Sequence, residues 1–178
     1  FDVAPQWVLK KYPESKMITA DGKTVEPIVV SHRQIGGFPG TCYNHKEAFE
    51  ARMEFLRQTV KRYKDHPALD MWDVWNEPEQ CGANRFPKEE TLTCFCDTCK
   101  NKFAKYLECK YKSVDTLNDI WGRCYDSFED IELPTTSATF GDFIDFRGFH
   151  LDTMTEEANQ RIRLIKEMDP THPVYLHV

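Results

Sequence analysis

Apolar residues recur every three or four positions over residues 45–64, which is the pattern of a helix with one buried face. The residues on this face are Phe49, Met53, Leu56, Val60 and Tyr63. Asn44 followed by Glu47 resembles a capping box at the start of the pattern, and His66-Pro67 closes the turn after it. The pattern therefore predicts an amphipathic helix over residues 45–64.

Three further helices are predicted downstream. The first covers about residues 100–110, and a shorter one follows that Ser113 caps and Gly122 ends. A long helix is predicted over about 141–168, where Asp169-Pro170 stops it. Its predicted core face is Leu151, Met154, Ala158, Ile162 and Ile165.

A run of large apolar side chains from Leu69 to Trp75 has the composition of a strand buried on both faces. Pro78 cannot donate a further ladder hydrogen bond, so the strand should end at Asn76-Glu77. A second strand begins at Val174. Strands that alternate with helices indicate an α/β fold.

The end of the first strand carries an amide beside a carboxylic acid, Asn76 and Glu77. In a parallel α/β barrel the chemistry lies at the C-terminal ends of the strands. Asn76 would hold a substrate hydroxyl while Glu77 protonates a leaving oxygen, which suits the cleavage of a sugar. The alternative is that Glu77 caps the next helix or pairs with an arginine. Glu79 is a rival acid, but it lies past the proline, where we expect it to face solvent.

Residues 1–43 lack a long periodic pattern, and proline and glycine interrupt them often, which predicts a long loop. A loop of this length in a compact domain is usually functional. Trp7 near its start is a candidate platform for stacking a sugar, and the alternative is an aromatic that pins the loop.

The composition fits a single domain, with 178 residues of which 40% are hydrophobic. The formal charge of −6 leaves no broad basic field, which argues against nucleic acid and anionic lipid as partners. No apolar run reaches the roughly 18 to 20 residues of a membrane span, so the sequence predicts a soluble chain. Because the chain begins at Phe1 and not at Met, the presence of an upstream segment stays open.

Seven cysteines are an odd number for a closed disulfide framework, and their clustering is more informative. Cys94, Cys96 and Cys99 lie within six residues, a spacing that strains a disulfide but suits thiolates on one metal ion. Zinc is the expected metal, and a closed structural site needs a fourth ligand, for which Cys42 and Cys81 are the candidates. The alternative is a set of buried free thiols. A thiolate metal site favours a reducing compartment, which predicts a cytoplasmic protein.

Several motifs occur together and in order along the chain. They are Pro5-Gln6-Trp7, Lys11-Tyr12-Pro13-Glu14, Trp75-Asn76-Glu77-Pro78, Cys94-Phe95-Cys96-Asp97-Thr98-Cys99, Phe103, Tyr106-Leu107, Lys110-Tyr111, Leu117-Asn118, Trp121-Gly122, Asp145-Phe146-Arg147, Phe149-His150 and Asp169 to Val174. With them the chain resembles glycoside hydrolase family 42, the retaining β-galactosidases of the large barrel clan. The resemblance spans nearly the whole chain.

The resemblance implies a partial (β/α)8 TIM barrel, about strands 4 and 5 with their helices, as a fragment of a single catalytic domain over residues 1–178. It implies a zinc-binding insertion over about residues 80–122. It further implies that Glu77 is the general acid/base, that Asn76 contacts the sugar, and that Cys42, Cys94, Cys96 and Cys99 hold a structural zinc ion, with Cys81 as the alternative to Cys42.

The implied reaction is the hydrolysis of terminal β-D-galactosyl residues by double displacement, in which a second carboxylate attacks the anomeric carbon. In the family that carboxylate lies on a later strand than this chain contains, so we expect the chain alone to be inactive. Family members often form trimers, which predicts a homotrimer for the parent protein.

One departure from the family concerns the sugar. The family usually has an arginine-containing segment just before its first zinc cysteine, whereas residues 36–41 here read Gly-Gly-Phe-Pro-Gly-Thr. Arg33 is the candidate substitute. One alternative is therefore a glycosidase of the same clan acting on a mannan or glucan. An alternative from another class is a non-catalytic zinc-stabilised binding module.

Overall fold

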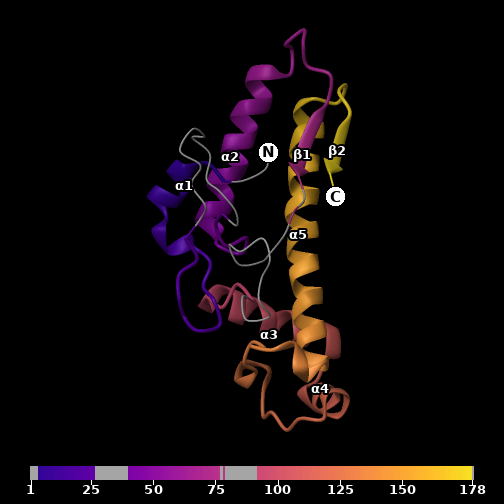
Figure 1. The fold of residues 1–178 in the computed structure, drawn as a ribbon. Helices are drawn as coiled ribbons and strands as arrows, with labels where there is room; N and C mark the ends of the chain where they lie inside the picture. The colour runs from indigo at the N-terminus through magenta and orange to yellow at the C-terminus, as the bar shows by residue number, and fades with distance from the viewer. Residues whose placement is uncertain (1–3, 27–39, 77, 79–91, 178) are drawn as a thin grey trace.

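The computed structural model describes residues 4–26, 40–76, 78 and 92–177. Two parallel strands, β1 (Trp72–Asn76) and β2 (Val174–His177), lie side by side, and α5 (Gly141–Met168) packs against both (Figure 1). Parallel strands need such a crossover helix between them. The α/β fold predicted from the sequence is confirmed at this level.

Three helices complete the main framework. They are α2 (Lys46–Tyr63), α3 (Asp97–Tyr111) and α4 (Val114–Trp121), and short 3-10 turns follow at Phe128–Asp130 and Ser137–Thr139. The helix predicted over 45–64 and the long helix predicted over 141–168 are confirmed. Ser113 Oγ caps α4 by accepting a hydrogen bond from the Thr116 N–H, and Gly122 ends α4 in the left-handed conformation, as predicted.

The hydrophobic core has two main centres along α5. Around the strands the core consists of Leu56, Val60, Trp72, Val74, Trp75, Ala158, Leu164 and Ile165. Around the other half of α5 it consists of Phe103, Leu107, Leu117, Ile131, Leu133, Phe146 and Phe149. With 28 residues α5 is about 42 Å long, far longer than either strand. It therefore carries α3 and α4 beyond the C-terminal ends of β1 and β2 (Figure 1).

A β-bulge interrupts β1. Asp73 pairs with Tyr175 and Asn76 pairs with His177, so β1 uses three steps where β2 uses two. The extra residue allows both Val74 and Trp75 to be buried in the core. It also places Asp73 and Asn76 on the same face of the sheet.

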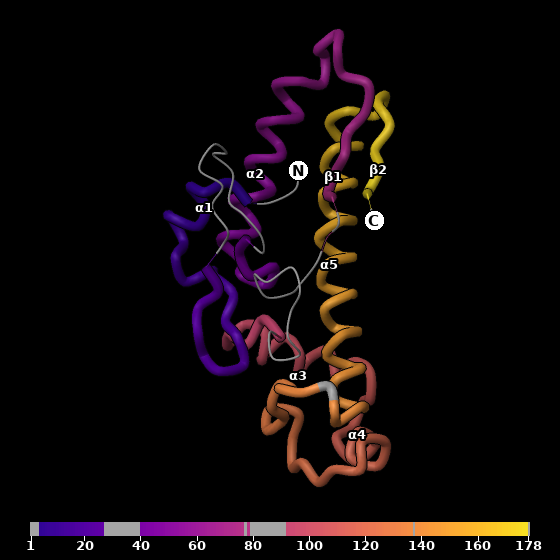
Figure 2. Tube along the Cα trace, viewed as in Figure 1, coloured from indigo at the N-terminus to yellow at the C-terminus, as the bar shows by residue number. Residues whose placement is uncertain are grey.

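The N-terminal segment differs from the predicted long loop. Residues Gln6–Lys11 form α1, and Pro13–Ser15 form a 3-10 turn. Val8 of α1 packs with Ala4 and with Ala48 of α2. The chain after α1 then runs toward the start of α3 (Figure 2), where Thr19 and Thr93 form a β-bridge.

Three details of the predicted helices are wrong. Tyr63, predicted on the buried face of α2, is 44% exposed. Asn44 does not cap α2, because the N-cap is His45, whose Nδ1 accepts a hydrogen bond from the Ala48 N–H at 3.3 Å. Leu151 does not face the core and is 58% exposed, because the N-terminal half of α5 extends past the strands. Among the described residues, no helix combines the length and the apolar composition that a membrane crossing requires.

Candidate active site and metal centre

Asn76 is the last residue of β1 and lies at the C-terminal end of the strand pair. Val174 and Leu176 of β2 pack against the core, so the neighbouring positions Tyr175 and His177 belong to the opposite face. Asn76 pairs with His177 and therefore lies on this same face, away from α5. Of the other predicted site residues, Glu77, Arg33 and Cys81 lie outside the described residues.

A buried charge network supports the strand from the helix side. Arg161 of α5 donates from Nη1 to the Val74 carbonyl oxygen at 3.3 Å, and its guanidinium carbon lies 4.0 Å from the centroid of the Trp75 ring. Arg161 also donates to Glu157 at 2.5 Å. The last residues before Asn76 are thus fixed by a cation that touches both their backbone and their side chain.

The same network reaches the loop ahead of α2. Arg52 of α2 forms two hydrogen bonds with Glu157, of 2.7 Å from Nη2 and 3.1 Å from Nε, and a third with the Thr41 hydroxyl. Burial alone would raise the pKa of Glu157, but the Arg52 and Arg161 guanidiniums outweigh burial and lower it. The Glu157 carboxylate of α5 is therefore connected to β1 through Arg161, and to α2 and Thr41 through Arg52.

Sequence reasoning missed this network. A signal was present, because Arg52 falls on the buried face of α2 with Ala48 and Leu56, four residues to either side. A charged residue on the apolar face of a helix needs a buried partner. Glu157 and Arg161, spaced by four on α5, had the same signal.

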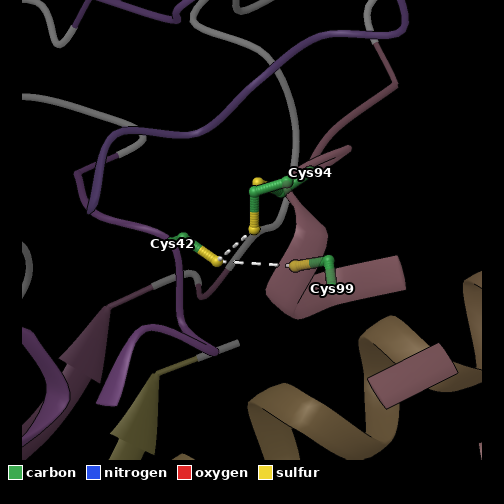
Figure 3. A group of neighbouring side chains, drawn as sticks. Cys42, Cys94 and Cys99 are labelled. Atoms are coloured by element: carbon green, nitrogen blue, oxygen red, sulfur yellow. Dashed lines mark hydrogen bonds between the residues drawn. The ribbon is translucent and has the colours of Figure 1, made fainter. Parts of the chain in front are cut away.

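The four cysteines named from the resemblance come together. The Sγ atoms of Cys42, Cys94, Cys96 and Cys99 all lie within 4.8 Å of one another. Cys42 comes from the loop before α2, Cys96 is the N-cap of α3, and Cys99 is in its first turn. Figure 3 shows the side chains of Cys42, Cys94 and Cys99 converging on one point.

The spacing of the sulfur atoms fits a tetrahedral metal ion. Zinc–thiolate bonds of about 2.3 Å in a tetrahedron place the sulfur atoms about 3.8 Å apart. The Cys42 Sγ lies 3.7 Å from the Cys96 Sγ and 3.4 Å from the Cys99 Sγ. Four sulfur atoms at this spacing suit Zn²⁺, and they leave no vertex for a water or a substrate.

The electrostatics of the cluster also suit a cation. Hydrogen bonds from Cys42 and then Cys94 lower the pKa of Cys96, while hydrogen bonding to Cys42 raises the pKa of Cys99 far above its usual range. Four adjacent thiols cannot all ionise without a positive charge between them. A divalent cation would allow all four to bind as thiolates.

A second buried carboxylate holds the helical pair α3 and α4 on α5. Asp145 accepts hydrogen bonds from the Tyr111 hydroxyl at 2.5 Å and from Trp121 Nε1 at 3.1 Å, and it pairs with Lys110. Each of these partners belongs to α3 or α4. Asp145 thus fixes the segment that carries three of the four cysteines.

The remaining candidate, Trp7, lies on α1 with 44% of its surface exposed. The core around α1 is separate from the core around β1. A groove of about 830 Å³ between α2, α3 and α5 is lined by residues such as Asn44, Lys102 and Phe149. It lies on the helix side of the sheet and does not include Asn76.

Solved structures share this fold across almost the whole chain. A β-galactosidase from Bacillus circulans sp. alkalophilus matches with a TM-score of 0.73 at 24% identity, covering 97% of this chain and 25% of that one. A catalytic mutant of a family 42 β-galactosidase from G. stearothermophilus matches with a TM-score of 0.75 at 26% identity, covering 98% and 24%. The fold is therefore part of the TIM barrel of such enzymes.

The sequence comparison agrees. The family model for glycoside hydrolase family 42, described as β-galactosidase, matches residues 2–177. β-Galactosidases from Geobacillus kaustophilus and Heyndrickxia coagulans are each 30% identical over 96% of this chain. The chain belongs to glycoside hydrolase family 42. It spans about a quarter of the length of these curated relatives, 24% in both cases.

Proposed function

We propose that the protein carrying this chain is a retaining β-galactosidase, in which Glu77 is the general acid/base and Asn76 binds the sugar next to the scissile bond. The observation that carries the proposal is the position of Asn76 at the C-terminal end of β1, facing away from α5, in a chain of family 42. This is the end of the strands where barrel enzymes place their chemistry.

The reaction would proceed in two displacements. A second carboxylate, from a part of the full-length protein beyond this chain, attacks the anomeric carbon while Glu77 protonates the departing oxygen. Glu77 then acts as a base and activates the water that releases the sugar. The two carboxyl groups of a retaining pair stand about 5 to 5.5 Å apart. Residues 1–178 alone should therefore not hydrolyse a galactoside.

The four cysteines would hold a structural zinc ion in this enzyme. The support is their fit to a tetrahedral site with no open vertex, which leaves no position for a catalytic water. Among the described residues Cys42 offers the fourth sulfur, which supports Cys42 over the alternative Cys81 as the fourth ligand. The ion would cross-link the loop before α2 to the start of α3, and α3 would belong to an insertion over about residues 80–122 of one catalytic domain.

Substitution of Glu77 in the full-length protein tests the catalytic assignment. Glu77→Gln should lower kcat/KM for an aryl β-galactoside by about 10²- to 10⁴-fold, because general acid–base catalysis contributes that much. Glu79→Gln is the matched control and should stay near the wild-type rate. If Glu77→Gln cleaves normally, the assignment fails.

A panel of aryl glycosides tests the sugar. We expect the full-length protein to prefer the galactoside over the mannoside and glucoside, with Arg33 replacing the usual arginine segment and Trp7 stacking on the sugar. The fold alone does not decide the substrate, since a family 42 exo-carrageenase from Bacteroides ovatus matches with a TM-score of 0.64 at 21% identity. Preference for another sugar would leave the glycosidase chemistry standing and overturn the galactose specificity.

A non-catalytic zinc-stabilised module is the alternative from another class. It predicts that the full-length protein loses its fold on chelation and hydrolyses none of these glycosides. The family resemblance further leads us to propose a cytoplasmic homotrimer, which light scattering coupled to size exclusion tests.

A further inference from the structure

Asn44 is a buried amide beside the cysteine cluster. It is 5% exposed, and its Nδ2 lies 3.4 Å from the Cys99 Sγ. On the other side its Oδ1 lies 3.1 Å from the Lys102 Nζ. An ammonium group only donates, so the atom facing Lys102 must be the oxygen, and the amide N–H₂ is left to face the sulfur.

The three residues come from both segments that supply the cysteines. Asn44 follows Cys42 by two residues, and Lys102 follows Cys99 by three residues on α3, about one turn later. Asn44 therefore stands between the loop before α2 and the first turns of α3. Its amide is not used to cap α2, since His45 performs that role.

Hydrogen bonds to sulfur matter at such a centre because four thiolates around Zn²⁺ carry a net charge of −2. An N–H donor stabilises the negative charge on sulfur and fixes the direction of its lone pairs. The backbone N–H of Ile18 also lies 3.4 Å from the Cys94 Sγ. The Lys102 ammonium at the amide oxygen polarises Asn44 and makes its N–H a stronger donor.

We propose that Lys102 and Asn44 form a relay that orients the Cys99 thiolate and offsets part of the negative charge of the metal centre. This inference rests on the proposed zinc site and is independent of the sugar chemistry. Lys102 is exposed at the rim of the groove between α2, α3 and α5, so its ammonium group contacts both the Asn44 amide and the solvent.

The test is the zinc affinity of the full-length protein, measured by competition with a chromophoric chelator. Asn44→Leu keeps the size of the side chain and removes the donor, and it should weaken zinc binding about 10- to 100-fold. Asn101→Leu, an exposed asparagine on α3, is the matched control and should stay within about twofold of the wild type.

Lys102→Met isolates the charge. It should weaken zinc binding, though by less than Asn44→Leu does. Lys105→Met, at an exposed lysine one turn further along α3, should leave zinc binding unchanged. Because Lys102 acts through the amide, adding Lys102→Met to Asn44→Leu should cause no further loss. Since Lys102 and Lys105 are both on the surface, the comparison of Lys102→Met with Lys105→Met decides the proposal even if Asn44→Leu does not fold.

A second readout separates tuning from general destabilisation. In the Co²⁺-substituted protein, the sulfur-to-cobalt charge-transfer band should move to longer wavelength in Asn44→Leu, because a sulfur without its hydrogen bond is easier to oxidise. An unchanged band together with unchanged zinc affinity in Asn44→Leu would overturn the relay while zinc stays bound. A wild-type protein that binds no zinc would overturn the metal centre, and the relay with it.

Discussion

Glu157 is a carboxylate with 3% of its surface exposed, between two guanidiniums that are 6% exposed. Glu157→Gln would leave Arg52 and Arg161 buried without their shared counter-charge. We expect a loss of about 3 to 5 kcal/mol in the free energy of unfolding, the usual cost of breaking a buried ion pair. Urea unfolding measures it, and Glu156→Gln, an exposed neighbour on α5, should cost less than about 0.5 kcal/mol.

The pH dependence of the same group has a definite sign. The pKa of Glu157 is lower in the folded chain than its ordinary value of 4.5, so its contribution is complete above that value and is lost as the pH falls through the folded pKa. The fall in stability at pH values below about 4.5 should therefore be smaller in Glu157→Gln than in the wild type. Equal stability of the two proteins at neutral pH would contradict the network.

His150 should control stability over a different range. It is 1% exposed, and neither ring nitrogen has a hydrogen-bond partner among the described residues. Burial, with a smaller effect of Arg147, lowers the pKa of His150 from 6.5 to about 3. Below pH 6.5 the unfolded chain takes up a proton that the folded chain refuses, so stability falls as the pH falls.

The expected slope is about 1.4 kcal/mol per pH unit between about pH 6 and pH 3 from this residue alone. His150→Leu should remove that contribution and be more stable than the wild type at pH 4.5. Chemical unfolding at a series of pH values checks it. Parallel curves for the two proteins would show that His150 is not a buried neutral imidazole.

Among the helices, α4 depends for its stability on Gly122, which ends it in the left-handed conformation. Gly122 has φ of 65°, and a Cβ built there meets nothing within 4 Å, so the cost of a side chain comes from the backbone conformation alone. Gly122→Ala should cost about 1 kcal/mol, and Gly122→Asn clearly less, because asparagine tolerates the left-handed region. Thermal unfolding compares them, and equal losses for the two variants would contradict this explanation.

Sequence periodicity predicts the extents of α2, α4 and α5 well because each has a buried apolar face, although Tyr63 and Leu151 on the predicted faces are exposed. It fails for α1, whose six residues are stabilised by packing Val8 against Ala48 of another helix. Sequence analysis also misplaced the cap of α2, because the Asn44 side chain donates its hydrogen bond to Cys99 Sγ, 55 residues away. Contacts of this range leave no local pattern.

The candidate site shows the same division. The spacing of Cys94, Cys96 and Cys99 predicts a metal site by itself, whereas Cys42 followed from family resemblance, and the structure brings all four together. The bulge in β1, which places Asn76 on the face away from α5, depends on the register with β2. No pattern within residues 69–76 alone indicates that register.

In the whole molecule, the cysteine cluster connects segments that lie 54 to 57 residues apart in the sequence, from Cys42 to Cys96 and Cys99. Removal of zinc by a chelator should therefore lower the Tm by more than about 10 °C, and added Zn²⁺ should restore it. Cys94→Ser should behave like the chelated protein, and Cys124→Ser, at an exposed cysteine, like the wild type. An unchanged Tm after the metal is shown to be gone would contradict a structural role.

The described strands are a small part of a barrel, and α5 extends well past them to carry the cysteine-bearing segment. In a (β/α)8 enzyme the rest of the barrel closes the open face on which Asn76 lies. The family membership of the chain and its coverage of about a quarter of each relative fit this view. In such a barrel we expect Glu77, next to Asn76, to be the acid/base of a retaining β-galactosidase.

Product analysis of the full-length Glu77→Ala variant, which leaves room for a small anion, with an activated aryl β-galactoside and azide tests the role of Glu77. Azide needs no general base, so we expect it to restore turnover and to give the β-galactosyl azide as product, identified by proton NMR. No rescue by azide, or the α-anomer as product, would contradict the assignment of Glu77.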